Sequence, residues 1–311
     1  MEIVKFRAMT FIVALMLILI IGLSVYTQNK ASPQLSSMLR SAVPPTKPVD
    51  SLFLAARLLL RTHDMTVHND ASMITALRHV AINFDDAILG GDEILTYFSS
   101  LQLTIMEREC QGLTFSCWDG ISFFRQQQDY LRIARGFAKN HTSDIKPDRE
   151  LVYCETGFNS GMSALPFLLS GYKVFSFDLM KNRYSPSCSL NLEILFPEKF
   201  SSIKGSSRVT MERFRQNSPH ILCDVMSVDG GHSKVHVLND IKEFREMSQP
   251  KNLILIDDVF PMDTSGVYQG LLAAVDKGYV RTPDTCYDGE KVNTNRGLRH
   301  KGYCVARLVH I

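Results

Sequence analysis

The residues best able to do chemistry in this 311-residue sequence stand where short apolar runs stop. Residues 151–163 read LVYCETGFNSGMS, an apolar run that breaks into glycines beside Glu155. Glycine lets a backbone approach a ligand closely because it carries no side chain. By itself, such a turn indicates either a tight connection between a strand and a helix or a cradle for a cofactor.

A second acid favours the cofactor interpretation. The run KVFSFDL at residues 173–179 carries Asp178 near its end, about 20 residues beyond Gly157. In nucleotide-binding α/β proteins, an acid at this distance from a glycine-rich turn binds a ribose diol. The two features together predict a site for a nucleotide-like ligand.

Two later apolar runs end in further carboxylates. Asp229 closes residues 220–229 and is followed three positions later by His232, whereas Asp257 and Asp258 follow NLILI. Ligands of open α/β sheets bind outside the carboxyl ends of the strands, so these side chains are expected to converge. Carboxylate oxygens suit Mg²⁺ or Mn²⁺, and a histidine can act as general base near neutral pH. Each acid alone could instead cap a helix or form a turn.

From residue 150 onward, short apolar runs alternate with amphipathic segments. The predicted buried strands are residues 151–156, 173–179, 220–230 and 252–260, and the predicted helices are residues 161–170, 187–196 and 234–247. Strands and helices that alternate in this way predict a parallel sheet covered on both faces. Residues 279–289 and 302–311 look like a final antiparallel pair joined by a loop rich in Gly and Asn.

These segments resemble the class I S-adenosylmethionine-dependent O-methyltransferases, and within them the catechol and macrocin O-methyltransferase-like branch. Residues 155–163 fit that branch's E-x-G-x-x-x-G-x-S motif, and residues 224–233 resemble its D-x-x-x-x-D-G-x-H-S stretch. Residues 203–207 resemble the segment after its third strand, and residues 256–259 its I-D-D-V strand. The resemblance covers roughly residues 150–311. Some relatives carry a lysine as the base where this chain has His232.

The resemblance implies a Rossmann-like, seven-stranded α/β sheet with helices on both faces. It implies an S-adenosyl-L-methionine-dependent O-methyltransferase, assisted by Mg²⁺ or Mn²⁺, that acts on a hydroxyl of a small molecule or glycan. The implied cofactor-binding residues are Glu155, Gly157, Asn159, Gly161, Ser163, Asp178, Ser206 and Asp229. The implied metal ligands are Asp229, Asp257 and Asp258, with His232 as the catalytic base.

The first 149 residues have a different character. Residues 8–26 contain no charged residue and are close to the roughly 20 residues that cross a bilayer as a helix. A cleaved secretory signal is the competing interpretation. The expected organisation is a cytoplasmic tail at 1–7, a transmembrane anchor at 8–26, a stem at 27–50, a helical region at 51–149 and the methyltransferase domain at 150–311.

Cysteines and a glycosylation triplet bear on the location. In an oxidising lumen, Cys110–Cys117 and Cys286–Cys304 are the expected disulfides, whereas Cys154 and Cys223 are expected to be buried thiols. Asn140 begins an Asn-x-Thr acceptor triplet, and Lys5 and Arg7 precede the apolar span. We therefore expect a single-pass type II membrane protein with a lumenal, ER or Golgi, or extracellular catalytic domain.

Two other classes of function remain open at this point. Golgi glycosyltransferases share the anchor, stem and lumenal domain, but they usually carry a D-x-D motif after a strand. A non-catalytic module with a methyltransferase-like fold would bind a ligand without turnover. The net charge of +2 and the lack of a basic run give no indication of a nucleic-acid partner. The sequence leaves the oligomeric state open.

Overall fold

A computed structural model describes most of the sheet domain and parts of the region before it. The described residues are 95, 98–99, 101–103, 105–106, 109–110, 124–141, 149–262, 264–294 and 297–310. The strands are β1 (Val152–Thr156), β2 (Lys173–Asp178), β3 (Phe200–Lys204), β4 (Cys223–Val228), β5 (Ser248–Ile256), β6 (Thr285–Thr294) and β7 (Gly297–Ala306). The helices are α6 (Phe124–His141), α7 (Ala164–Leu169), α8 (Ser185–Leu195), α9 (Ser207–Asn217), α10 (Lys234–Glu246) and α11 (Gly266–Asp276).

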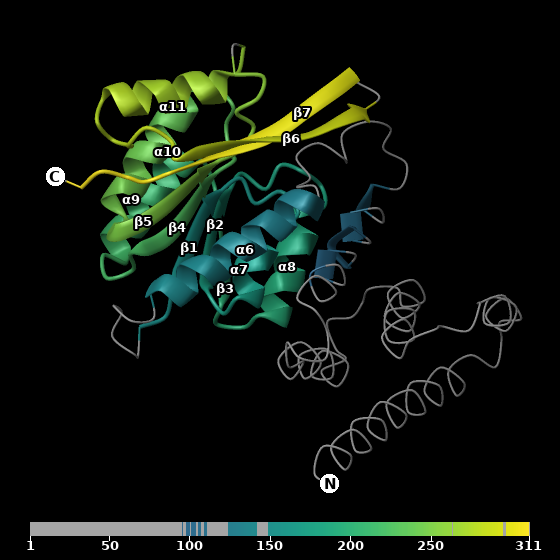
Figure 1. Cartoon of the computed structure of the whole chain (residues 1–311). Helices are drawn as coiled ribbons and strands as arrows, with labels where there is room; N and C mark the ends of the chain where they lie inside the picture. Colours follow the sequence, from purple (N-terminus) through teal and green to yellow (C-terminus); the bar gives the residue numbers. More distant parts are fainter. Residues whose placement is uncertain are drawn as a thin grey trace, which may run out of the picture. The chain divides into compact units, whose positions relative to one another are not determined.

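The strands form one seven-stranded sheet in the order β3-β2-β1-β4-β5-β7-β6 (Figure 1). Strands β1 to β5 pair in parallel, whereas β7 pairs antiparallel with both β5 and β6. Strand β1 has β2 on one side and β4 on the other. The connection from β1 to β2 therefore runs toward one edge of the sheet, and the connection from β4 to β5 runs toward the other edge. This switch point is where open α/β sheets bind ligands.

Helices cover both faces of the sheet, as the sequence predicts (Figure 1). On one face, α9, α10 and α11 pack against side chains such as Cys154, Met226 and Ile254 in one buried cluster. On the other face, the ring of Tyr153 stacks on Phe167 of α7 with 3.7 Å between ring centroids. Since successive residues of a strand point to opposite faces, neighbours such as Tyr153 and Cys154 belong to different layers.

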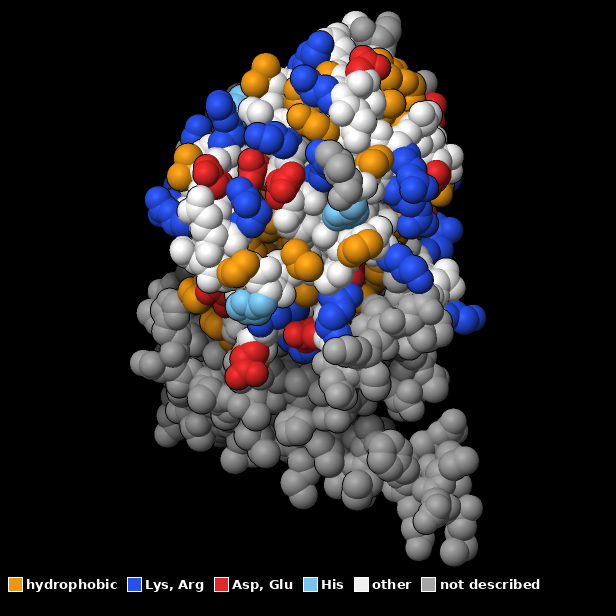
Figure 2. All heavy atoms as spheres, turned by 90° about the vertical axis from the view of Figure 1, so that its left-hand side faces the viewer, with side chains coloured by type: hydrophobic (Ala, Val, Ile, Leu, Met, Phe, Trp, Pro, Cys, Tyr) orange, Lys and Arg blue, Asp and Glu red, His pale blue; other side chains and the backbone are white. Residues whose placement is uncertain are grey.

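The outer face of α9 to α11 carries no single type of side chain. Figure 2 shows Lys and Arg side chains interspersed with acidic and apolar ones. Val209 on α9 and Val235 on α10 are among the exposed apolar residues there, and each is more than half exposed. Single exposed apolar side chains of this kind are normal on soluble surfaces.

The predicted parallel strands at 151–156, 173–179, 220–230 and 252–260 are confirmed as β1, β2, β4 and β5. The predicted final pair is antiparallel, but its boundaries are wrong. Strands β6 and β7 extend through most of the segment expected to be a loop, and their pairing reaches Thr294 opposite Gly297. Backbone hydrogen bonds do not need apolar side chains, so a polar stretch can continue a hairpin.

The expectation that Cys154 and Cys223 are thiols is wrong. The two residues form a disulfide with 5.9 Å between their Cα atoms, and both are fully buried. Their apolar surroundings suggested inert thiols, but the pairing of β1 with β4 brings together two cysteines that are 69 residues apart in sequence. Only the strand order reveals this cross-link.

The predicted Cys286–Cys304 disulfide is confirmed, between directly opposite positions of β6 and β7. Cys110 is also disulfide-bonded. The predicted Cys110–Cys117 pair includes Cys117, which lies outside the described residues.

The predicted cytoplasmic tail, anchor and stem lie outside the described residues, as does most of the region at 51–149. Within the predicted helical region at 51–149, the structure describes α6, which packs beside α7 on the sheet. Among the residues that the structure describes, no helix combines the length and apolar character needed to span a membrane.

The buried cross-link between β1 and β4 should stabilise the domain strongly. Replacing Cys154 and Cys223 by Ala should lower the free energy of unfolding by about 4 kcal/mol, because the disulfide closes a loop across 69 residues. The matched Cys286→Ala and Cys304→Ala variant, with a separation of 18 residues, should lose about 3 kcal/mol. Urea unfolding followed by circular dichroism measures both, and an unchanged midpoint in the first variant would contradict the cross-link.

Candidate functional site

A pocket of about 500 Å³ opens at the carboxyl ends of β1, β2 and β4. It lies at the switch point of the sheet, between the turns that follow these strands. The lining residues are Thr156, Gly157, Asn159, Phe177, Asp178, Leu179, Lys181, Asn182, Gly205, Ser206, Ser207, Asp229, Gly230, Gly231, His232, His236 and Asp258. The residues predicted from sequence that line it are Gly157, Asn159, Asp178, Ser206, Asp229, His232 and Asp258.

Gly157 brings the turns after β1 and β4 into direct contact. Its φ of +87° lies in the left-handed region, and a Cβ atom at this position would lie 2.0 Å from the carbonyl oxygen of Asp229. Its N–H donates to the carbonyl of Phe177 at 3.0 Å, and the N–H of Asp229 donates to Thr156 at 3.0 Å. Any side chain on Gly157 would therefore push apart the two turns that form the pocket.

Asp178 is the last residue of β2 and lines the same pocket. One oxygen of its carboxylate accepts the N–H of Asn159 at 3.2 Å, and the other accepts the N–H of Met180. Asn159 has a φ of +52°, and its side-chain oxygen accepts the hydroxyl of Tyr184 at 2.5 Å. A carboxylate offers about four acceptor positions, so Asp178 keeps the capacity to accept hydrogen bonds from a diol in the pocket.

Glu155 does not line the pocket. It is buried, and its carboxylate accepts hydrogen bonds from Ser176 at 2.6 Å, Ser163 at 2.7 Å and Tyr153 at 3.1 Å. Burial raises the pKa of Glu155 from 4.5 to about 7, although the three hydroxyls act in the opposite direction. Gly161 does not line the pocket either, and a Cβ there would lie 2.5 Å from the ring of Phe158. Glu155, Ser163 and Gly161 thus support the turn from within the protein.

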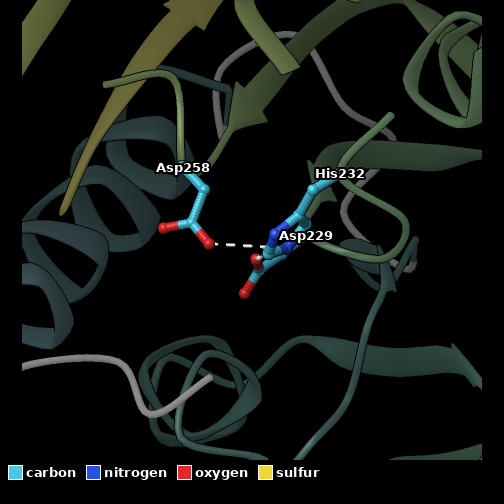
Figure 3. A group of neighbouring side chains, drawn as sticks. All are labelled: Asp229, His232 and Asp258. Carbon is cyan, nitrogen blue, oxygen red and sulfur yellow. Dashed lines mark ion pairs between the residues drawn. The ribbon is translucent and has the colours of Figure 1, made fainter. Parts of the chain in front are cut away.

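The three side chains Asp229, His232 and Asp258 line the pocket, and Figure 3 shows them close together. The Nε2 atom of His232 lies 3.4 Å from Asp258 Oδ2 and 3.8 Å from Asp229 Oδ1. One ligand atom from each residue lies within 4.8 Å of the other two. Carboxylate oxygens with an imidazole nitrogen form a ligand set for a divalent cation.

Asp257, the remaining predicted metal ligand, is not part of this group. It is 2% exposed, and its carboxylate accepts the N–H of Asp258 at 2.9 Å. The pKa of Tyr130 on α6 is raised well above its usual range, first by burial and then by the negative charge of Asp257. The charge of the pocket residue Asp229 also raises this pKa, so the separation of the acids rests on the pocket lining. Asp257 does not line the pocket, whereas Asp258, with a φ of +54°, does.

Sequence reasoning missed His236, which lines the pocket, and Asp240, which binds the pocket residue Ser207. Asp240 of α10 is buried, and it accepts a hydrogen bond from Ser207 at the start of α9 at 2.8 Å. Burial raises the pKa of Asp240. His236 lines the pocket, and its Nδ1 atom lies 2.7 Å from the hydroxyl of Ser233. An acid on the buried face of the amphipathic helix α10 was a signal for Asp240. His232 precedes this helix, so helical spacing gave no signal for His236.

Comparisons with known proteins agree with this architecture. Residues 154–259 match the family described as "Methyltransferase domain". Among solved structures, a Klebsiella pneumoniae protein assigned as an O-methyltransferase aligns with a TM-score of 0.50 at 15% identity, covering 76% of this chain and 99% of that one. The O-methyltransferase from Bacillus cereus in complex with SAH aligns with a TM-score of 0.50 at 12% identity, covering 75% and 99%.

None of the curated proteins matches this chain significantly. At identities of 15% and 12%, the two structures show the fold rather than the activity. The chain thus shares the Rossmann-like fold of these two structures, and the match to the methyltransferase domain family runs from within β1 to just after β5.

Glu155 should make the stability of the domain depend on pH. Below pH 4.5 its carboxyl is protonated in both the folded and the unfolded chain. Between pH 4.5 and about 7 the unfolded chain ionises while the folded chain keeps the proton, so the contribution to stability falls as pH rises. Over this window the free energy of unfolding should fall by about 3 kcal/mol on account of this group.

The Glu155→Gln variant isolates this effect, because its amide does not titrate. Denaturant unfolding should be measured from pH 4 to pH 8 in steps of about one pH unit. The free energy of unfolding should depend less on pH in the variant than in the unmodified protein. Glu246→Gln, a matched substitution at an exposed position, controls for the loss of one carboxyl group. Two parallel curves for the unmodified protein and Glu155→Gln would show that Glu155 is not a buried, neutral acid.

Proposed function

We propose that this protein is an S-adenosyl-L-methionine-dependent O-methyltransferase that methylates a hydroxyl of a small molecule or glycan with the help of a divalent cation. The observation that carries the proposal is one pocket that combines the glycine turn, the Asp178 carboxylate and the Asp229–Asp258 pair. The first two features suit the cofactor, and the third suits the acceptor oxygen.

The residues of the pocket fit S-adenosyl-L-methionine. A volume of about 500 Å³ lies within the usual range for small-molecule sites. The Asp178 carboxylate can accept hydrogen bonds from the two ribose hydroxyls, and the turn at Gly157 lines the same pocket. The negative charge of Asp229 suits a positively charged sulfonium group.

The chemistry asks little of the protein beyond alignment and proton transfer. S-adenosyl-L-methionine supplies a methyl group that is already activated by the sulfonium. The pocket has to hold the acceptor hydroxyl in line with that methyl group. Such alignment removes a large part of the activation free energy of the reaction. Asp229 and Asp258 can hold a cation that lowers the pKa of this hydroxyl. The imidazole of His232 lies beside both acids, where it can serve as a base or as a ligand.

The proposed location is the lumen of the secretory pathway or the extracellular space, behind an N-terminal membrane anchor. Two disulfides within the sheet domain support an oxidising environment, because such cross-links persist mainly in secretory and extracellular proteins. Asn140 is exposed at the end of α6, where an oligosaccharide transferase could reach it.

Ligand binding separates the proposed enzyme from a glycosyltransferase. Calorimetry should detect S-adenosylhomocysteine binding and no binding of nucleotide sugars. Asp178→Ala should weaken S-adenosylhomocysteine binding about 10- to 100-fold, because it removes hydrogen bonds to a charged group. Asp284→Ala, which removes an exposed acid outside the pocket, is the matched control. Binding of a nucleotide sugar in place of S-adenosylhomocysteine would refute the proposal.

Turnover separates the enzyme from a non-catalytic module of the same fold. Incubation with S-adenosyl-L-methionine labelled in its methyl group and with an extract of small molecules and glycans should transfer label to an acceptor. Asp229→Asn should lower that transfer by about 100-fold or more, because it removes a charge next to the reacting groups. Tight S-adenosylhomocysteine binding without transfer to any acceptor would favour the binding module.

Glycosylation of Asn140 tests the location. In a secretory cell, the full chain should lose apparent mass on treatment with a glycan-removing amidase. The Asn140→Gln variant should migrate at the lower mass without treatment, while Asn217→Gln, an asparagine at the end of α9 without an acceptor triplet, should not change. A full chain that never shifts would argue against a lumenal domain.

A further inference from the structure

The three side chains that meet in the pocket are not the three carboxylates expected from the sequence. Figure 3 shows the Asp258 carboxylate directed toward the imidazole of His232, with Asp229 beside it. The ion-pair distances of 3.4 Å and 3.8 Å place the His232 Nε2 atom between the two acids. All three residues line the pocket, so an ion held there would face the space for the ligands.

Asp257 lies outside this group because of its position directly after β5. Ile254 and Ile256 of β5 belong to the core cluster that α10 and α11 cover. Since side chains alternate along a strand, Asp257 points to the opposite face. There it is 2% exposed and does not line the pocket. The next residue, Asp258, has a left-handed backbone conformation that turns the chain. Its carboxylate lies on the pocket side.

We propose that His232 is the third protein ligand of a divalent cation, together with Asp229 and Asp258, and that the site consequently prefers a first-row transition ion such as Mn²⁺ to Mg²⁺. Asp257 is not a ligand. The proposal deepens the proposed function by naming the class of ion and its ligands, and it rests on that function only for the role of the ion in methyl transfer.

The chemistry of the donor set supports this preference. Mg²⁺ favours oxygen ligands in a near-ideal octahedron and usually keeps several waters. Imidazole nitrogen binds transition ions much better, and their affinities rise from Mn²⁺ through Co²⁺ and Ni²⁺. Two carboxylates and one imidazole leave positions open for water or for an acceptor oxygen. An Nε2 lone pair given to the ion is no longer free to take a proton, so His232 is not the general base in this arrangement.

Metal binding by the full chain, freed of ions with a chelator, tests the proposal without any methyl transfer. Mn²⁺ titration followed by electron paramagnetic resonance should show binding. In competition, the affinity for Mg²⁺ should be at least about tenfold lower than that for Mn²⁺. The spin echo of bound Mn²⁺ should carry the modulation of a directly coordinated nitrogen. This signature needs no variant, so it does not depend on how well any substitution folds.

Three substitutions assign the ligands. His232→Ala should lower Mn²⁺ affinity by at least about 10- to 100-fold and remove the nitrogen modulation. His232→Asp should restore binding with an oxygen ligand and reduce the preference for Mn²⁺ over Mg²⁺. Asp257→Asn, the matched change of the acid next to Asp258, should leave Mn²⁺ affinity and the nitrogen signal unchanged.

Opposite results overturn the proposal. These are equal affinity for Mg²⁺ and Mn²⁺, bound Mn²⁺ without a nitrogen signal, loss of binding in Asp257→Asn but not in His232→Ala, and no binding at millimolar Mn²⁺. S-adenosylhomocysteine calorimetry on the same ion-free samples keeps the two proposals apart. If S-adenosylhomocysteine binds while Mn²⁺ does not, the metal assignment fails and the methyltransferase function stands.

Discussion

The pocket depends on the contact between the turns that follow β1 and β4. At Gly157 this contact leaves no room for even one methyl group, because a Cβ atom would lie 2.0 Å from the carbonyl oxygen of Asp229. The two turns diverge from the sheet in opposite directions at the switch point, yet their first residues touch. As a result, a ligand bound beside Gly157 also lies beside Asp229, and the cofactor and acceptor sides of the proposed site share one wall.

The alternation of side chains along the strands then divides the acids between two environments. Glu155 and Asp257 face the α6 and α7 side, where both are buried. Glu155 accepts hydrogen bonds from three hydroxyls, and burial raises its pKa to about 7. Asp229 and Asp258 line the pocket, where they lie close to His232. The neighbouring acids Asp257 and Asp258 therefore have different roles. Asp257 is part of the protein interior, and Asp258 is available to a ligand.

Parts of the fold could be predicted because they depend on short stretches of the sequence. Buried parallel strands are short continuous apolar runs, and four of the five appear as such. Strand β3 lies at the edge of the sheet and is largely half-exposed, so its sequence FSSIK shows no such run. Cys286 and Cys304 sit in one hairpin, and short separation was enough to pair them. The Cys154–Cys223 disulfide joins strands 69 residues apart, and no local pattern could indicate it.

By itself, the sequence determined the alternating α/β architecture, the glycine turn with Asp178 at the next strand end, and the acids at the ends of β4 and β5. These follow from short-range patterns of apolar, glycine and acidic residues. Only the tertiary structure decided which acid of the Asp257–Asp258 pair reaches the pocket, that Glu155 lies in the interior, and that Asp240 reaches α9. Each of these depends on which helix covers which face of the sheet, and that is set by packing between distant segments.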